Sequence, residues 1–324
     1  MASATCVPHT SYLATPEFMA TALHTITAVD IPIVAYGGYC ILLKTPKEMS
    51  SVKGLMLLLH VLTALSDLFI SFVTIPLALF PAAAGYGLGF FDAPGLEFYI
   101  MVTFVNFVAA TVVAVYENRY FVLFGWNTWW KHARKPFLSV VFLLAPLFFL
   151  PPYIDIPDQE LGRHQVSLIL PCLPQFTFND RKMYVLSLDY VLPSVCMAAV
   201  TLFYASILIV FFFIIFSKIL MKKEMTVSAR TQKMQRKFAV AFAIQSVFLF
   251  LSLLTPIVVI LISIVVYYHN QAINNLMLIV FSFHGFGSTV VMMVVYKPYR
   301  DFTISLLHCS KEESKETRVT SIVL

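Results

Sequence analysis

The side chains with which this chain could do chemistry are ionisable residues set inside long apolar stretches. They are His24, Asp30, His60, Asp67, Glu117, Arg119, Asp189 and His284. A charge at the centre of an apolar span costs about 2.5–3.5 kcal/mol on insertion scales, so such residues are expected to face the protein interior and to mark functional positions. Their spacing matches no metal site, nucleophile elbow or phosphate-binding loop. We therefore expect no enzymatic activity, no cofactor and no bound metal.

Four polar residues are expected to meet near the middle of the membrane. His60 and Asp67 are seven residues apart, so they share one face of a helix. Asp67 and His284 each lie roughly 12–13 residues, or about 20 Å, from the same end of their spans. We predict that these two residues pair, with Ser288, a trapped water or an ion beside them, and that the group of four acts as a polar switch. A static polar contact is the alternative.

Two further polar residues are candidates for ligand contact. The hydropathy pattern places Asn106 inside the third apolar span and Asp189 in the outer part of the fifth, just before Pro193. Ligand sites between helices are mostly apolar, with a few polar anchors. Asn106 and Asp189 are therefore predicted to line a ligand pocket.

A third set of residues is expected to couple the protein to a partner at its basic side. The third span closes with Glu117-Asn118-Arg119-Tyr120, in which an acid and an arginine can form a charge cluster that rearranges on activation. Snorkelling of Arg119 to lipid headgroups is the alternative. The basic segment 218–237 is either a solvated loop or a docking face for a cytosolic partner. The predicted coupling residues are Glu117, Arg119, Lys233, Arg236, Pro298, Tyr299 and Arg300.

These residues must be positioned by membrane-spanning helices. Of the 324 residues, 59% are hydrophobic and only 12% are charged, whereas soluble domains carry about 25% charged residues. With about 20 apolar residues in each span, the sequence predicts an all-α bundle of seven transmembrane helices. They lie at about 18–43, 54–80, 96–123, 137–154, 184–217, 238–267 and 274–296.

Lysine and arginine are distributed unequally between the two sides of this bundle. Of the 22, only Arg163, Arg181 and Lys182 fall on the side that holds the N-terminus. The positive-inside rule therefore predicts an extracellular N-terminus, 1–17, a membrane domain, 18–297, and a cytoplasmic tail, 298–324. Because the net charge of +5 comes from short loops beside the membrane, we expect the lipid bilayer, and not nucleic acid, to be the partner of these basic residues.

Two of the five cysteines, Cys6 and Cys172, face an oxidising exterior in this topology. A disulfide between them is the favoured hypothesis, and two unpaired thiols are the alternative. The other three cysteines fall in spans or on the inner side.

The segment after the seventh span has features of its own. Pro298 ends the span because it supplies no backbone N–H. Phe302, Leu306 and Leu307 then recur at helical spacing and predict a short amphipathic helix on the inner leaflet. Cys309 follows, either as a palmitoylation site or as a free cytosolic thiol.

Short motifs along nearly the whole chain occur in an order that resembles one family, the nematode serpentine receptor class H chemoreceptors. They are Ser11-Tyr12-Leu13, Pro16-Glu17-Phe18, Lys44-Thr45-Pro46-Lys47-Glu48-Met49, His60 with Asp67, Pro81 with Ala84-Gly85-Tyr86, Glu117-Asn118-Arg119, His284-Gly285, Ser288-Thr289 and Pro298-Tyr299-Arg300.

The resemblance implies a G-protein-coupled receptor without catalytic residues. It further implies a multi-pass protein of the plasma membrane in the sensory cilia of chemosensory neurons, with a small environmental molecule as ligand and a heterotrimeric G protein as partner. The chain departs from rhodopsin-type receptors, because Glu117-Asn118-Arg119 stands where Asp-Arg-Tyr is usual and the seventh span has no Asn-Pro-x-x-Tyr. A ligand-gated channel or transporter that uses the intramembrane acids as ion sites is the alternative.

Overall fold

The structure, a computed structural model, describes residues 4–7, 11–91, 93–173, 182–220 and 229–306. Within these residues, six helices are long and apolar enough to cross a membrane, and a bent pair of helices makes a seventh span. The seven-helix bundle that the sequence predicts is therefore confirmed, and the chain is a multi-pass membrane protein.

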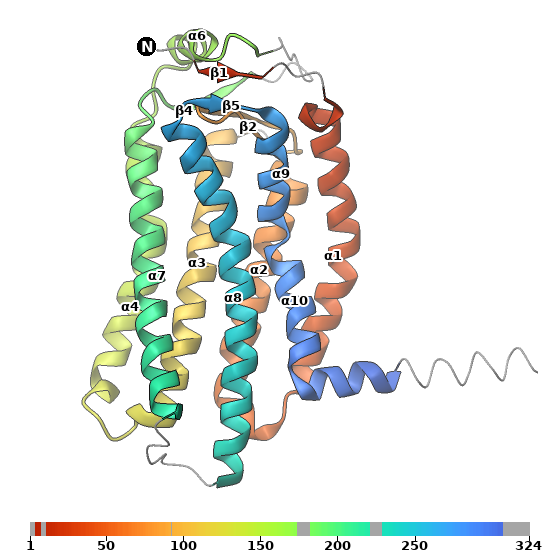
Figure 1. Cartoon of the computed structure of the whole chain (residues 1–324), viewed down its shortest axis with the longest axis vertical. Helices are drawn as coiled ribbons and strands as arrows, with labels where there is room; N and C mark the ends of the chain where they lie inside the picture. Colours follow the sequence, from red (N-terminus) through yellow and green to blue (C-terminus); the bar gives the residue numbers. More distant parts are fainter. Residues whose placement is uncertain (1–3, 8–10, 92, 174–181, 221–228, 307–324) are drawn as a thin grey trace, which may run out of the picture.

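The helices of the bundle run side by side (Figure 1). The six continuous spans are built on α1 (Pro16–Lys44), α2 (Ser50–Leu68), α3 (Pro94–Tyr120), α4 (Trp130–Leu147), α7 (Val191–Leu220) and α8 (Ala229–Val265). A π-helical turn extends α2 to Thr74 and another extends α3 to Gly125, while α5 (Leu150–Ile154) continues α4. The seventh span consists of α9 (Gln271–Ser282) and α10 (His284–Val295), which meet at 43°.

Short strands and one helix close one end of the bundle, which we call the strand end. β1 (Thr5–Cys6) pairs in parallel with β5 (Tyr268–His269), and β2 (Pro76–Ala78), β3 (Ala83–Gly87) and β4 (Tyr184–Ser187) form an antiparallel sheet. The helix α6 (Gln159–Ile169) lies over them (Figure 1). Together these elements form the strand cap. We call the opposite end of the bundle the basic end.

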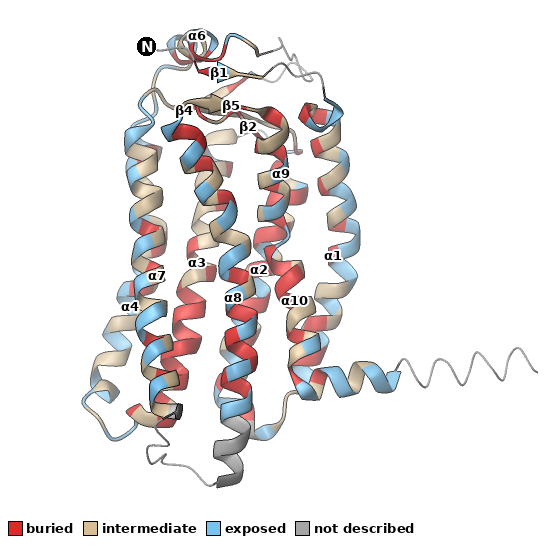
Figure 2. Ribbon diagram, in the orientation of Figure 1, coloured by how far each residue is buried: buried red, intermediate tan, exposed pale blue. Residues whose placement is uncertain are grey.

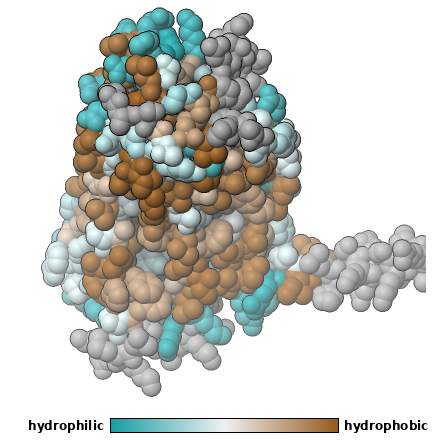
Figure 3. Space-filling view, turned by 45° about the horizontal axis from the view of Figure 1, so that its top comes forward, coloured by the Kyte–Doolittle hydropathy of each residue, from teal (hydrophilic) through white to brown (hydrophobic). Residues whose placement is uncertain are grey.

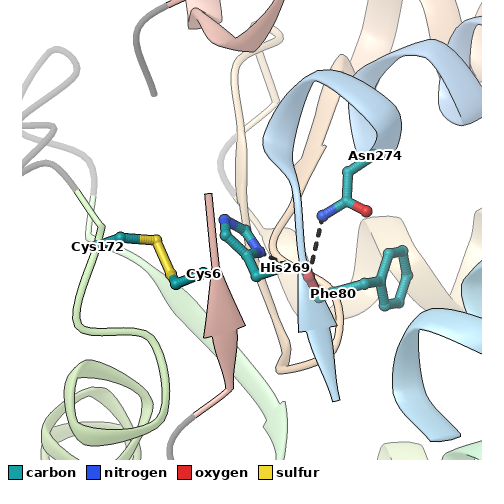
Figure 4. Close-up of a disulfide and its surroundings, with 5 residues drawn as sticks. All are labelled: Cys6, Phe80, Cys172, His269 and Asn274. Atoms are coloured by element: carbon teal, nitrogen blue, oxygen red, sulfur yellow. Dashed lines mark hydrogen bonds between the residues drawn. A yellow bond between two sulfur atoms is a disulfide. The ribbon is translucent and has the colours of Figure 1, made fainter. Parts of the chain in front are cut away.

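A disulfide between Cys6 and Cys172 fastens the strand cap, with the two Cα atoms 6.0 Å apart. Beside it, His269 and Asn274 both point to the backbone carbonyl of Phe80 (Figure 4). His269 Nδ1 lies 2.7 Å from this oxygen, and Asn274 Nδ2 donates to it at 3.1 Å. The N-terminal strand, the α2–α3 connection and the α8–α9 connection are thus held together at one point.

Two of the predicted spans are too long at the strand end. The second was expected to reach residue 80, but its helix ends at Thr74 because Ile75 has a positive φ of 43° and Pro76 begins β2. The fifth was expected to begin at residue 184, but Tyr184–Ser187 is β4 and the helix starts at Val191. In both places an apolar run continues from a helix into a sheet, so hydropathy alone does not mark the boundary.

The most continuously buried helix of the bundle is α3, which is also the centre of the main hydrophobic cluster (Figure 2). By contrast, α1, α4 and α7 expose many apolar side chains on their outer faces. On the face shown in Figure 3, hydrophobic side chains form a broad band over the helices, and hydrophilic residues gather on the strand end. The band is the surface expected to contact lipid tails.

Residues 297–306 form a helix that turns sharply away from the bundle at the basic end (Figure 1). The short helix predicted after the seventh span is therefore present. Thr303 Oγ1 lies 2.8 Å from the hydroxyl of Tyr36, and Lys44 Nζ lies 4.0 Å from the centre of the Phe302 ring. These contacts dock the helix against α1. Cys309 lies outside the described residues.

Candidate functional site

A large cavity lined by described residues begins beneath the strand cap and extends into the bundle. Its volume is about 280 Å³. The side walls come from α3, α7 and α8, and strands β2, β3 and β4 contribute the wall at the strand end. Most of the lining is apolar and includes Phe98, Met101, Val105, Met197, Val200, Leu249, Leu253 and Ile257. We call this cavity the long pocket.

A few polar side chains interrupt the apolar wall of the long pocket. Asn106 lines this cavity, and its Nδ2 donates to the backbone carbonyl of Ala145 at 2.9 Å, which fixes the orientation of the amide. Glu97 is the acidic residue in the lining, and its Oε1 accepts a hydrogen bond from the N–H of Ala93 at 3.1 Å. This bond places the carboxylate at the N-terminus of α3, where the helix dipole favours negative charge.

Toward the strand end of the pocket, two lining hydroxyl groups have no hydrogen-bond partner within the described part of the chain. They belong to Tyr184 in β4 and to Ser194 in the first turn of α7. Burial raises the pKa of Tyr184 to about 12, so the phenol stays protonated near neutral pH and remains a hydrogen-bond donor. An unpaired buried hydroxyl is unusual and marks a position where a ligand atom can bind.

Asp189 does not line the long pocket, contrary to the prediction from sequence. It lies in the turn before α7 and is exposed, and its Oδ1 accepts a hydrogen bond from the N–H of Val191 at 2.9 Å. The fifth span begins seven residues later than hydropathy indicated, so Asp189 caps the helix from outside instead of standing within it.

Asp67 and His284 are brought together in the interior of the bundle, at the break between α9 and α10. His284 Nδ1 lies 2.9 Å from Asp67 Oδ1, and both side chains are fully buried. The N–H of Phe286 donates to Asp67 Oδ2 at 2.9 Å, so the carboxylate also binds the first turn of α10. Asp30 on α1 is buried as well and interacts electrostatically with both residues. Three helices therefore meet at this charged group.

The other two predicted switch residues, His60 and Ser288, belong to a separate polar group nearer the basic end. His60 Nε2 lies 2.9 Å from the backbone carbonyl of Val34, and Ser288 Oγ accepts from Gln245 Nε2 at 3.0 Å. Both line a small cavity of about 10 Å³, roughly the space of one water molecule. Of the predicted alternatives beside the Asp67–His284 pair, which were Ser288, a water or an ion, Ser288 is the one that the structure directs elsewhere, because its hydroxyl bonds to Gln245 on α8.

At the basic end, Glu117 is paired with a residue that the sequence did not indicate. Its carboxylate accepts from Arg134 Nε at 3.1 Å and Arg134 Nη2 at 2.9 Å, and also from Trp130 Nε1 at 2.8 Å. The expected cluster of Glu117 with Arg119 is not formed. Residues two apart on a helix point in different directions, so Glu117 faces α4 while Arg119 faces α8 and α10.

Arg119 is 1% exposed, and its guanidinium lies 3.6 Å from the centre of the Phe238 ring. Phe238 in turn packs edge-to-face against Tyr296 at the end of α10, with ring centres 5.1 Å apart. Phe238 and Tyr296 belong to a hydrophobic cluster that also contains Val112 and Leu249 from the lining of the long pocket. A continuous set of packed side chains thus joins the pocket to Arg119.

The remaining predicted coupling residues surround this cluster. Tyr299 is fully buried, and its hydroxyl lies 2.8 Å from Thr45 Oγ1. Pro298 and Arg300 lie in the helix of residues 297–306, where Arg300 is exposed, and Arg236 is exposed on α8. The side chain of Lys233 and residues 221–228 of the basic segment lie outside the described part of the structure.

The chain matches the sequence profile of a known family over residues 14–309. That family is described as serpentine type 7TM GPCR chemoreceptor Srh. The chain is also similar to a Caenorhabditis elegans protein named serpentine receptor class H-72. The two are 24% identical over 330 residues, which cover 95% of this chain and 90% of the relative.

Proposed function

The chain belongs to the Srh family of serpentine seven-transmembrane chemoreceptors, and from this premise we propose that it binds a small molecule in the long pocket and activates a heterotrimeric G protein at the basic end. The observation that supports this most strongly is the long pocket itself. It is apolar, carries few polar anchors and lies between the helices, as ligand sites in helix bundles do.

The proposal includes an orientation, with the strand end outside the cell and the basic end inside. Cys6 and Cys172 are bonded in the strand cap, and disulfides persist in oxidising compartments. The basic end carries Arg119, Arg134, Arg236, Lys218 and Lys297, which suits the cytoplasmic side. The ligand then arrives from outside. We propose that the receptor lies in the plasma membrane of sensory cilia, a location that its membership of a chemoreceptor family supports.

The signal is proposed to pass through the packed side chains between the pocket and Arg119. A ligand that fills the part of the long pocket nearer the basic end pushes on Val112 and Leu249, which belong to the same hydrophobic cluster as Phe238. Packed interiors transmit strain because they contain few voids. Movement of Phe238 with α8 would uncover the guanidinium of Arg119 and make it available to a G protein.

The buried group of Asp67 and His284 is proposed to set the balance between the two states. It links α2 to the break between α9 and α10, and separating a buried charged pair costs about 3–5 kcal/mol. An Asp67→Asn change is therefore expected to alter signalling more than ligand binding. Equal loss of surface expression in Asp67→Asn and His284→Ala would instead give the pair a purely structural role.

The test is a ligand screen with a Gα-coupled second-messenger readout in cells that express the chain. Arg119→Ala is run in parallel, and Arg163→Ala in the strand cap serves as the control. A response that Arg119→Ala abolishes at equal surface expression supports the proposal. A ligand-evoked current that persists when G proteins are blocked would overturn it in favour of the channel or transporter.

A further inference from the structure

The long pocket is much longer than it is wide. Its lining runs on α3 from Pro94 to Val112, from Tyr190, just before α7, to Leu208 on α7, and on α8 from Ser246 to Ile264. Each stretch corresponds to about 27 Å of helix at 1.5 Å per residue. A sphere of the same volume, 280 Å³, would be only about 8 Å across. The cavity therefore has the shape of a slender tube along the bundle axis, which suits an extended chain better than a compact ring system.

The charges of the lining residues also limit which ligands can bind. Its residues include no lysine, arginine, histidine or aspartate, and Glu97 is already engaged by the N–H of Ala93. An anionic ligand would lose its hydration in this cavity without gaining a cationic partner among the described lining residues, which is strongly unfavourable. The pocket thus selects against carboxylates.

The strand end of the tube offers hydrogen bonds to an uncharged group. The hydroxyls of Tyr184 and Ser194 are buried and have no partner among the described residues. The Tyr184 hydroxyl lies against the backbone of α3 at Gly95, where a Cβ atom would be only 2.6 Å away. This close approach holds the tyrosine at the wall of the pocket. A ligand oxygen can accept a hydrogen bond there while the rest of the molecule contacts only apolar side chains.

We propose that the ligand is an uncharged molecule with a slender aliphatic chain and one oxygen-bearing head group. The head, a hydroxyl or carbonyl, binds Tyr184 and Ser194, and the chain extends between α3, α7 and α8 toward Val112 and Leu208. This inference rests on the proposed function, since it names the ligand class of the same pocket.

The experiment measures binding and signalling separately, with the full chain reconstituted in lipid nanodiscs. The probes are octanol, octane, octanoate and the compact alcohol adamantanol, together with hexanol and decanol. Binding is read as ligand-induced thermal stabilisation, and signalling as nucleotide exchange on an added G protein. Each added methylene is expected to raise the affinity of the straight-chain alcohols about three- to fourfold. Octanoate and adamantanol are expected not to bind.

Matched variants distinguish binding in the long pocket from general effects of the probes on the bilayer. Tyr184→Phe should weaken octanol binding about fivefold to tenfold and leave octane binding unchanged. Ala205→Phe, which fills the tube part of the way along α7, should weaken decanol far more than hexanol. The control Leu202→Phe adds the same ring to the outer face of α7, where the side chain is 69% exposed, and should change neither.

The possible outcomes distinguish the two proposals. Binding of octanoate or adamantanol, or an equal effect of Tyr184→Phe on octanol and octane, would overturn the ligand class and leave receptor function standing. Saturable binding of octanol and decanol that never stimulates nucleotide exchange would support the ligand class and contradict G-protein coupling. Absence of binding by all the straight-chain alcohols in a folded preparation would overturn the inference.

Discussion

Removal of the Arg134 side chain should destabilise the protein strongly, because it leaves a carboxylate unpaired in the interior. Glu117 is 0% exposed and Arg134 is 23% exposed, and two of the three hydrogen bonds to the carboxylate come from Arg134. Breaking a fully buried pair costs about 3–5 kcal/mol. Partial exposure of Arg134 reduces this cost, and Trp130 still donates one bond, so we expect about 2–4 kcal/mol for Arg134→Ala.

The expected change is a lower melting temperature, by about 4–10 °C for a protein of this size. Thermal melting followed by circular dichroism of the purified chain measures it. The matched control is Arg163→Ala, which breaks a pair with Glu160 on α6, where the glutamate side chain is 82% exposed. A pair with an exposed partner contributes less than about 1 kcal/mol. Arg163 also donates a hydrogen bond to the Met183 carbonyl at 3.3 Å, which adds about 1 kcal/mol, so this variant should lose clearly less stability than Arg134→Ala.

A second substitution tests the reason for the effect. If the cost of Arg134→Ala comes from the unpaired charge of Glu117, then adding Glu117→Gln should recover part of the lost stability, because the buried group is then neutral. A double variant less stable than Arg134→Ala alone would refute this reasoning. An Arg134→Ala variant with the same melting temperature as the Arg163→Ala control would also refute it.

Three further predictions concern the bundle interior and the strand cap. Gly285→Ala places a Cβ 2.5 Å from Asp67 Oδ2, so it should lower the free energy of unfolding by about 1–3 kcal/mol in the same melting assay. A melting temperature equal to that of the unchanged chain would contradict the close packing of Gly285 against Asp67. Cys6→Ser should cost about 2–5 kcal/mol, whereas Cys196→Ser, which removes an unpaired thiol, should have little effect on melting. Burial lowers the pKa of His269, so the folded protein favours the neutral imidazole. Its contribution to stability is present above the ordinary histidine pKa of about 6.5 and is lost as the pH falls below it. His269→Gln should therefore reduce the loss of stability between about pH 7 and 5, and an unchanged dependence of the melting temperature on pH would contradict this role.

The helical bundle was predictable from the sequence because long apolar runs separated by short basic loops are typical of membrane-spanning helices. The approach of Asp67 to His284 was also predictable, since both lie at the same distance from the basic end of their spans. The pairing of Cys6 with Cys172 followed from the compartment that each cysteine was assigned to. These features depend on position along a helix axis, which residue counting gives directly.

The features that could not be predicted depend on how the helices are rotated and where they stop. Hydropathy does not distinguish a pocket-facing side chain from a lipid-facing one, so the contributions of Tyr184 and Leu249 to the pocket were missed. The partner of Glu117 comes from a different span, and no periodicity connects it to Arg134. Asp189 was predicted to lie inside the fifth span because the strand β4 is apolar and hydropathy does not separate it from α7. The one available signal for the cap was the group of prolines and glycines between residues 76 and 89, which is typical of turns.

The central claim is that a ligand in the long pocket drives a G-protein response. The most direct test compares the second-messenger response of cells that express the unchanged chain, Ala205→Phe or Leu202→Phe at equal surface levels, across a panel of neutral and charged small molecules. The account predicts a response that Ala205→Phe abolishes, that Leu202→Phe preserves, and that G-protein inhibition blocks. A response that survives both filling of the pocket and G-protein inhibition would contradict it.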